Sequence, residues 1–142
     1  MRKIILTVAA LLMSSAICAQ DDYVDGSYWT VTGVDTFPGQ FNAYLTDLNG
    51  AWRKSMEMLI ADEKVLSYKL LNNVNPREGE PDLWLMVEWS SGAAYMDTPR
   101  DYWDANARKL FGSMDNGAQA NKARGEMREI KSNILLRELR FN

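Results

Sequence analysis

The sequence predicts an α+β domain in which two helices cover one face of a four-stranded antiparallel sheet. Three observations lead to this prediction. Apolar residues alternate over 83–89, apolar residues recur every three or four positions over 41–62 and 99–114, and the segments follow the order strand–helix–strand–strand–helix–strand. Alternation places successive side chains on opposite faces of a strand, whereas the longer spacing places them on one face of a helix.

The first half of the domain is predicted to hold a strand, a long helix and a second strand. Residues 27–35 (SYWTVTGVD) and 64–73 (KVLSYKLLNN) are rich in β-branched, aromatic or other apolar side chains. Pro38-Gly39 ends the first strand, and proline also fits the first turn of a helix. The helix runs to about residue 62, although Gly50 within it costs about 1 kcal/mol relative to alanine. Its apolar stripe comprises Phe41, Tyr44, Leu45, Leu48, Trp52, Met56 and Leu59.

The second half begins with a turn-rich connection over 75–81 that leads to the strand 83–89. One face of this strand is predicted to carry Leu83, Leu85, Val87 and Trp89.

A second helix follows this strand. Asp97 or Thr98 is expected to cap it, with Pro99 opening its first turn. Gly112 and Gly117 are expected to interrupt it, and a short helical piece is expected to continue to residue 128. Its apolar stripe comprises Trp103, Ala107, Leu110, Phe111 and Met114.

The C-terminal half of 129–141 is predicted as the last strand. With right-handed crossovers, this order gives a ferredoxin-like layout. The first and third strands are then central in the sheet, and both helices lie on one face.

The opposite face of the sheet is predicted to be unusually apolar. It would carry Trp84 and Met86 with either Trp29 and Val31 or Tyr28 and Val34. An antiparallel sheet that faces water on one side normally keeps that side polar, and a large apolar patch is normally covered. We therefore expect a second copy to pack sheet to sheet, which gives a two-fold symmetric homodimer.

Residues 1–19 have the pattern of a secretory signal peptide. Arg2 and Lys3 precede an apolar stretch over 4–13, and the small residue Ala19 precedes the expected cleavage site. The stretch is short for a membrane span, and nothing later in the sequence is predicted to anchor the chain. We therefore expect a periplasmic or secreted protein without a membrane span.

The mature chain, 20–142, is expected to form a single domain with a loose acidic leader over 20–25. An alternative makes Cys18 a lipidated first residue of the mature protein, but Ile17 before it disagrees with the usual small residue at that position.

Composition excludes many kinds of site. The chain has no histidine, and its single cysteine, Cys18, falls in the predicted signal peptide. Histidine is the common neutral-pH base and metal ligand, and cysteine is the strong nucleophile and disulfide partner. The cluster Asp21, Asp22 and Asp25 lacks the spacing of a calcium loop. We predict no metal and no cofactor.

Charge argues against nucleic acid as a partner, because 19 acidic residues outnumber 16 Lys and Arg. The basic residues near the C-terminus are interleaved with acids and are expected to be solvated. They comprise Lys122, Arg124, Arg128 and Lys131.

Several segments together resemble the dimeric α/β-barrel superfamily, and in particular its small exported members of unassigned function. The resemblance is carried by Pro38-Gly39 before a helix with Tyr44 and Trp52, by Ser67-Tyr68 on the second strand and by Glu88 late in the third. It covers most of the mature chain and implies a ferredoxin-like fold and a dimer.

What the resemblance implies about activity is broad. The superfamily includes cofactor-free monooxygenases, cyclases, haem-handling enzymes, isomerases and stress proteins. Haem members commonly use a histidine ligand, and many others use a histidine in the pocket, neither of which this chain can supply. A fold shared by so many activities does not determine one.

Four residues are the candidates for a site between the two sheets. Glu88 is a weak candidate for a catalytic base, because a partly desolvated carboxylate has a raised pKa. Tyr68 could share its cavity as a hydrogen-bond donor, and Arg137 could be its counter-ion. Trp84 is the tryptophan best placed to line the cavity, and the other reading of it is simple packing.

Three functions remain open at this point. The first is a non-catalytic homodimer that binds a small hydrophobic or aromatic molecule between the two sheets. The second is a cofactor-independent monooxygenase, isomerase or cyclase that uses Glu88 as base. The third is an architectural partner of another envelope protein.

Overall fold

Four strands form one antiparallel sheet in the order β2-β3-β1-β4. The computed structural model describes residues 22–142, and the predicted signal peptide lies outside the described residues. Along the chain the elements are β1 (Tyr23–Thr36), α1 (Phe41–Asp47), the π-helix η1 (Leu48–Trp52), α2 (Arg53–Ala61), β2 (Val65–Asn72), β3 (Leu83–Trp89), α3 (Gly92–Met96), α4 (Arg100–Phe111), α5 (Met114–Gly125) and β4 (Arg128–Phe141).

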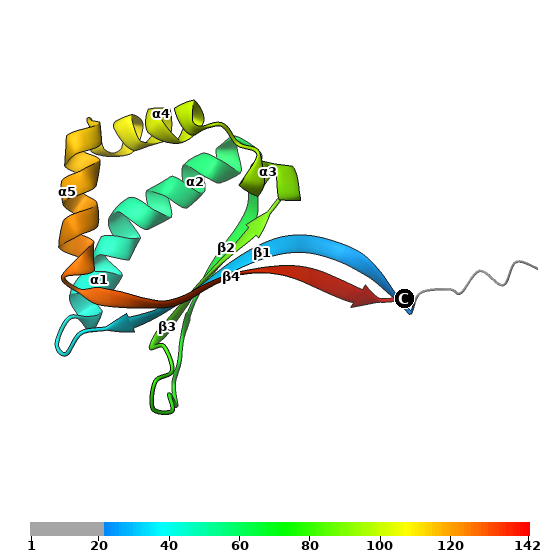
Figure 1. Ribbon diagram of the computed structural model, residues 1–142, viewed down its shortest axis with the longest axis horizontal. Helices are drawn as coiled ribbons and strands as arrows, with labels where there is room; N and C mark the ends of the chain where they lie inside the picture. The colour runs from blue at the N-terminus through cyan, green and yellow to red at the C-terminus, as the bar shows by residue number, and fades with distance from the viewer. Residues whose placement is uncertain (1–21) are drawn as a thin grey trace, which may run out of the picture.

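The helices all lie on one side of the sheet (Figure 1). α1, η1 and α2 form one continuous helix, and α4 and α5 make a corner around it. With β1 and β3 in the centre of the sheet, this is the ferredoxin-like α+β fold that the sequence predicts. In the described part of the chain, no helix is both long and apolar enough to cross a membrane.

The alternation along β3 has the predicted orientation. Leu83, Leu85, Val87 and Trp89 are all buried, and the residues between them are partly exposed. Core contacts join this face to the long helix, as predicted from the helical stripe. The buried members of that stripe are Tyr44, Leu48, Met56 and Leu59.

The helix boundaries after β3 differ from the prediction. A short helix, α3, was not predicted, and its N-cap is Ser91, whose Oγ accepts a hydrogen bond from the Ala94 N–H at 3.0 Å. The prediction that Asp97 or Thr98 caps the next helix is wrong, because Pro99 occupies the N-cap position of α4. Thr98 instead donates its hydroxyl to the Ala94 carbonyl at 2.7 Å.

One of the two predicted helix interruptions is confirmed. Gly112 ends α4 with a φ of 80°, a conformation that favours glycine. Gly117 lies inside α5 and interrupts nothing, because Ser113 has already capped α5 through the Asn116 N–H at 3.1 Å. The predicted helical piece after the interruption is confirmed as α5, which ends at Gly125 rather than at residue 128.

The two outer segments of the chain are longer strands than predicted. β1 begins at Tyr23 inside the predicted loose leader, and β4 is extended from Arg128 onwards. These two strands pair along nearly their whole length, from Tyr23 with Phe141 to Thr36 with Arg128. Backbone hydrogen bonds between the two strands therefore extend both of them beyond the bounds that the local sequence pattern predicts.

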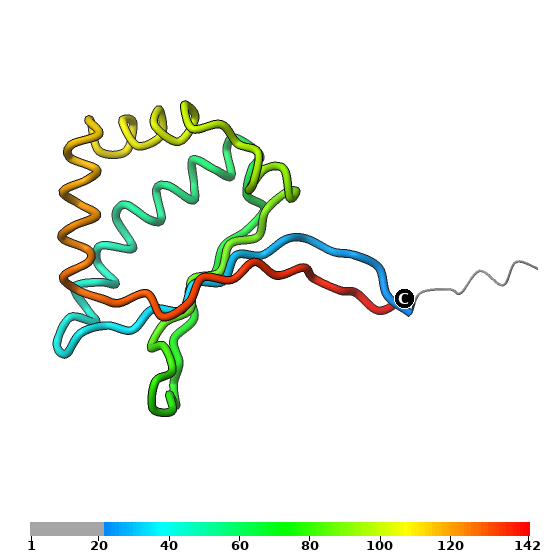
Figure 2. The backbone as a smooth tube through the Cα atoms, viewed as in Figure 1, coloured from blue at the N-terminus to red at the C-terminus, as the bar shows by residue number. Residues whose placement is uncertain are grey.

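The start of β1 and the end of β4 project beyond the helices as a two-stranded arm (Figures 1 and 2). Apolar side chains on this arm are exposed, and they comprise Tyr23, Val24, Leu139 and Phe141.

Asp82 ties the beginning of β3 to the end of β1. Its Oδ2 accepts hydrogen bonds from the Thr36 N–H at 2.9 Å and from the Thr36 hydroxyl at 2.5 Å. These two bonds lower the pKa of Asp82, the hydroxyl having the larger effect. A carboxyl group with a lowered pKa in the folded state contributes stability above its unfolded-state pKa, and this contribution is lost as the pH falls through the folded-state value.

We predict that Asp82→Ala lowers the free energy of unfolding by about 1 kcal/mol near neutral pH, a value reduced by the partial exposure of the group. The difference from the wild type should shrink below about pH 4, where aspartate is protonated even in the unfolded chain. Urea unfolding at a series of pH values measures it. A difference that stays constant down to acid pH would contradict the role assigned to the carboxylate.

Candidate functional site

The sheet face away from the helices, hereafter the open face, is apolar. Strand pairing places Trp29 and Val31 of β1 on this face with Trp84 and Met86 of β3, which selects one of the two predicted alternatives. The edge strands add Leu71, Ile134 and Leu136. These three residues are 44–47% exposed.

One end of the open face is polar. Glu88 accepts a hydrogen bond from the Ser67 hydroxyl at 2.6 Å, and the ammonium group of Lys69 lies 5.3 Å from the centre of the Trp29 ring. Glu138 on β4 pairs with Arg140 at 2.8 Å, and this hydrogen bond, together with the Ser27 N–H, lowers the pKa of Glu138. Ser67 and Lys69 lie on this same face of β2, opposite Glu88 and Met86.

Two of the candidate residues do not lie with Glu88. Tyr68 pairs opposite Val87 on the helix side of the sheet and makes an edge contact with Trp52, with ring centres 5.2 Å apart. The prediction that Tyr68 shares a cavity with Glu88 is therefore wrong. It failed because neighbouring residues on a strand point to opposite faces, and Ser67 occupies the place opposite Glu88.

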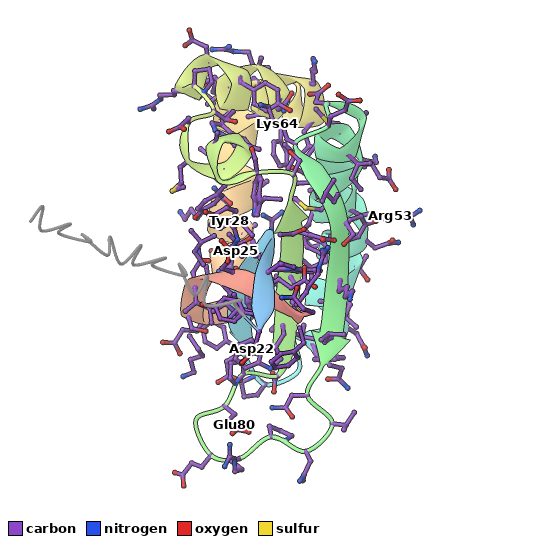
Figure 3. All side chains as sticks on the ribbon, turned by 90° about the vertical axis from the view of Figure 1, so that its right-hand side faces the viewer. Asp22, Asp25, Tyr28, Arg53, Lys64 and Glu80 are labelled. Carbon is purple, nitrogen blue, oxygen red and sulfur yellow. The ribbon has the colours of Figure 1, made fainter. Side chains whose placement is uncertain are left out.

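Arg137 is also on the helix side. Its guanidinium group lies 4.2 Å from the centre of the Tyr28 ring and pairs with Asp25 at 3.4 Å, and both partners belong to β1 (Figure 3). The prediction that Arg137 is the counter-ion of Glu88 is wrong. Arg140, rather than Arg137, supplies positive charge near Glu88 on the open face. The pKa of Arg140 is raised chiefly by Glu138 and slightly by Glu88.

Trp84 lies on the open face as predicted. It borders a broad depression of about 570 Å³ beside the β2–β3 connection, together with Leu71, Val74 and Pro81. The connection extends below the sheet, with Glu80 within it (Figure 3). Because this depression is open to solvent, a ligand-binding role for Trp84 stays a prediction.

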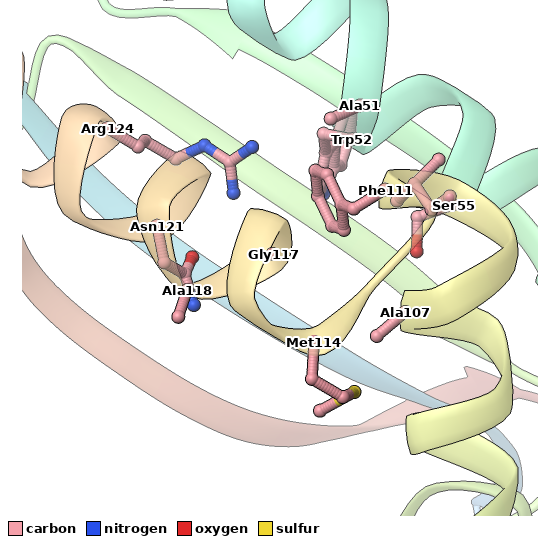
Figure 4. Close-up of a pocket in the computed structure, with 11 residues that line it drawn as sticks. Ala51, Trp52, Ser55, Ala107, Phe111, Met114, Gly117, Ala118, Asn121 and Arg124 are labelled. Carbon is pink, nitrogen blue, oxygen red and sulfur yellow. The ribbon is translucent and has the colours of Figure 1, made fainter.

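A cavity that the sequence did not predict lies within the helix layer (Figure 4). It has a volume of about 370 Å³ and lies between the η1–α2 segment on one side and α4 and α5 on the other. Its walls are mainly apolar, and its lining comprises Ala51, Trp52, Ser55, Ala107, Leu110, Phe111, Met114, Gly117, Ala118, Asn121 and Arg124. This volume is in the range of small-molecule pockets.

Local features of the helices create the space. Ala51, Ala107, Gly117 and Ala118 have little or no side chain where the helices face each other. η1, which supplies Ala51 and Trp52, is a π-helical turn, and such turns occur frequently at functional sites. Strand and helix periodicity cannot reveal a space of this kind, because it depends on how two distant helices pack.

Arg124, which lines one end of the helix-layer cavity, forms a largely buried ion pair with Asp47. Arg124 Nε lies 2.6 Å from Asp47 Oδ2, and the two side chains are only 14% and 24% exposed. Arg124 Nη2 is buried without a hydrogen-bond partner among the described residues. The expectation that Arg124 is solvated is therefore wrong, because α5 packs its C-terminal end against α1.

Tyr44 lies close to the Asp47–Arg124 pair. It is 1% exposed, and burial raises the pKa of its phenol against the opposing effects of Arg128 and Arg124. The guanidinium group of Arg128 lies 5.7 Å from the centre of the Tyr44 ring. Arg128 was also expected to be solvated, but it is partly buried.

No protein-family profile matches the sequence, and no curated protein is similar to it. Solved structures are similar at low identity. A dimeric ferredoxin-like protein from an uncultured marine organism shares 10% identity over 82% of this chain and 89% of its own, with a TM-score of 0.48. A dimeric protein of unknown function and ferredoxin-like fold from Bacteroides fragilis shares 15% identity over 79% and 94%, with a TM-score of 0.42.

A third structure, from Chloroflexus aurantiacus, is provisionally described as an antibiotic biosynthesis monooxygenase. It shares 14% identity over 78% of this chain and 91% of its own, with a TM-score of 0.45. The fold assignment itself rests on the strand order of this chain, and the assembly and activity of the neighbours are properties of those proteins.

The Asp47–Arg124 pair can be tested against an exposed pair in the same helical segment. We predict that Asp47→Ala lowers the free energy of unfolding by about 2–3 kcal/mol, because it leaves a mostly buried guanidinium group unpaired. Glu57→Ala, which breaks the exposed pair with Arg53, should cost less than about 0.5 kcal/mol. Urea unfolding of both variants measures the contrast, and equal losses would show that the buried pair has no special role.

Proposed function

We propose that this chain is an exported, homodimeric protein that binds a small apolar or aromatic molecule without transforming it. The observation that carries the proposal is the helix-layer cavity, whose volume of about 370 Å³ and mainly apolar lining suit such a ligand. Trp52 and Phe111 offer aromatic surface within it, which favours flat apolar molecules.

Binding is favoured over catalysis by the kinds of side chain in the cavity. Among the residues that line it, Arg124 is the only one with an ionisable side chain. Because a guanidinium group stays protonated at neutral pH, it cannot act as a general base. The enzyme hypothesis based on Glu88 would need a site on the open face. Tyr68 and Arg137 lie on the other face of the sheet, so they cannot assist Glu88 there.

The proposal moves the ligand from its predicted place between the two sheets to the helix layer of each copy. The helix-layer cavity exists within a single chain, whereas a space between two sheets would depend on how two copies pack. The open face is then free to form the dimer interface.

A second copy is the occupant of the open face that fits its chemistry best. The centre of this face is apolar, and the polar end carries both signs of charge in Lys69, Glu88, Glu138 and Arg140. In a two-fold interface the same patch meets itself, so apolar residues can pack on apolar residues and opposite charges can meet. The exposed apolar arm gives further surface for the same contact.

Export is supported by the signal-peptide pattern of residues 1–19. The domain has no need of a disulfide in an oxidising compartment, because two core clusters already hold the sheet to the helices. We propose a periplasmic or secreted location on this basis.

Ligand binding can be tested with N-phenyl-1-naphthylamine, a neutral fluorescent probe of suitable size. We predict saturable binding that Ala107→Phe abolishes, because the new ring fills the cavity. The control is Ala105→Phe on the exposed side of α4, which should bind the probe as the wild type does. Fluorescence titration measures both. A wild type that does not bind, or two variants that behave alike, would contradict the proposed site.

The dimer can be tested by placing a charge on the open face. We predict that Ile134→Glu gives monomers, because the carboxylate would be buried against the second copy without a partner. Ile60→Glu, at a similarly exposed isoleucine on α2, should leave the dimer intact. Sedimentation velocity distinguishes the two species. A wild type that sediments as a monomer at micromolar concentration would contradict the dimer.

A further inference from the structure

The surroundings of Arg124, at one end of the helix-layer cavity, have more positive than negative charge. Arg124 and Arg128 both approach Tyr44, and Asp47 is the one carboxylate that the described residues place in ion-pair contact with either arginine. Arginine keeps its charge at all physiological pH values, and the Tyr44 phenol, with its pKa raised by burial, is neutral. The three charged side chains therefore carry one uncompensated positive charge.

Donor groups are left unused at the same place. Arg124 Nη2 and Arg128 Nε are buried, and neither has a hydrogen-bond partner among the described residues. Buried guanidinium donors without an acceptor are costly, and native proteins normally satisfy them. An anion held in the cavity beside Arg124, the one charged residue of its lining, would supply the missing negative charge.

The cavity defines what would be attached to such an anion. Figure 4 shows the Arg124 side chain extending from α5 towards Trp52, at one end of the cavity. Away from Arg124 the walls are formed by Leu110, Phe111 and Met114, which suit an apolar body. Asn121, on the same helix as Arg124, adds an uncharged polar group.

We propose that the ligand of this cavity is an amphiphilic acid, with an apolar, preferably aromatic body against α4 and α5 and a carboxylate group directed to Arg124. This inference rests on the proposed function and narrows it to one chemical class. Arginine suits this role, because its guanidinium group stays charged and forms strong charge-assisted hydrogen bonds with carboxylate oxygens. Arg128 adds positive charge near Tyr44 without lining the cavity.

The experiment compares two probes that share a ring system, 1-naphthoate and 1-naphthalenemethanol, by isothermal titration calorimetry with the full mature protein. We expect 1-naphthoate to bind at least about tenfold more tightly, the ratio that a charge-assisted hydrogen bond provides. Arg124→Gln should remove this preference and Arg128→Gln should reduce it. The control Arg108→Gln, at an exposed arginine of α4, should retain it.

A further variant distinguishes a specific loss of binding from a loss caused by misfolding. Asp47→Asn removes the carboxylate that competes for Arg124, so it should tighten the binding of 1-naphthoate several-fold, a gain that an unfolded variant cannot produce. The inference is wrong if the wild type binds the two probes equally, or if Arg124→Gln keeps the preference. It is also wrong if N-phenyl-1-naphthylamine binds and neither naphthalene probe does. In each of these three cases the proposed function still stands. If 1-naphthoate, 1-naphthalenemethanol and N-phenyl-1-naphthylamine all fail to bind, the inference and the proposed function are both wrong.

Discussion

The sheet is apolar on both faces, although the helices of the same chain cover only one of them. On the helix side, β3 contributes an uninterrupted row of buried side chains from Leu83 to Trp89. On the open face, Trp29, Trp84 and Met86 lie between partly exposed aliphatic residues of the edge strands. Burial of apolar surface is the main driving force for association, so the proposed dimer depends on this second face.

The proposed coverage of the open face by a second copy would separate two roles within one small domain. The sheet would hold the dimer together, whereas the helix layer keeps a cavity in each copy. α4 and α5 contribute most of the cavity lining and pack on the sheet chiefly through their ends, which lets small residues such as Ala107 and Gly117 leave space. The buried Asp47–Arg124 pair joins this layer to the long helix and gives the cavity its polar end.

Local periodicity in the sequence was sufficient to predict most of the fold. The alternation over Leu83–Trp89 gave the strand, its bounds and its buried face, and the helical stripe gave the residues that pack on it. The cavity could not be predicted in this way. Its ion pair joins residues 77 positions apart, and its π-helical turn leaves no recognisable pattern in the sequence. Tyr68 and Arg137 were misplaced because register shifts in β1, β2 and β4 fix which residues share a face.

The central claim is that a second copy covers the open face. Native mass spectrometry of the protein recovered from the periplasm of a Gram-negative host tests it most directly, since one spectrum reports the number of chains and where each chain begins. We expect a dimer of chains that start at Gln20. A monomer at micromolar concentration would contradict it, because the apolar face would then be stable in water without a partner.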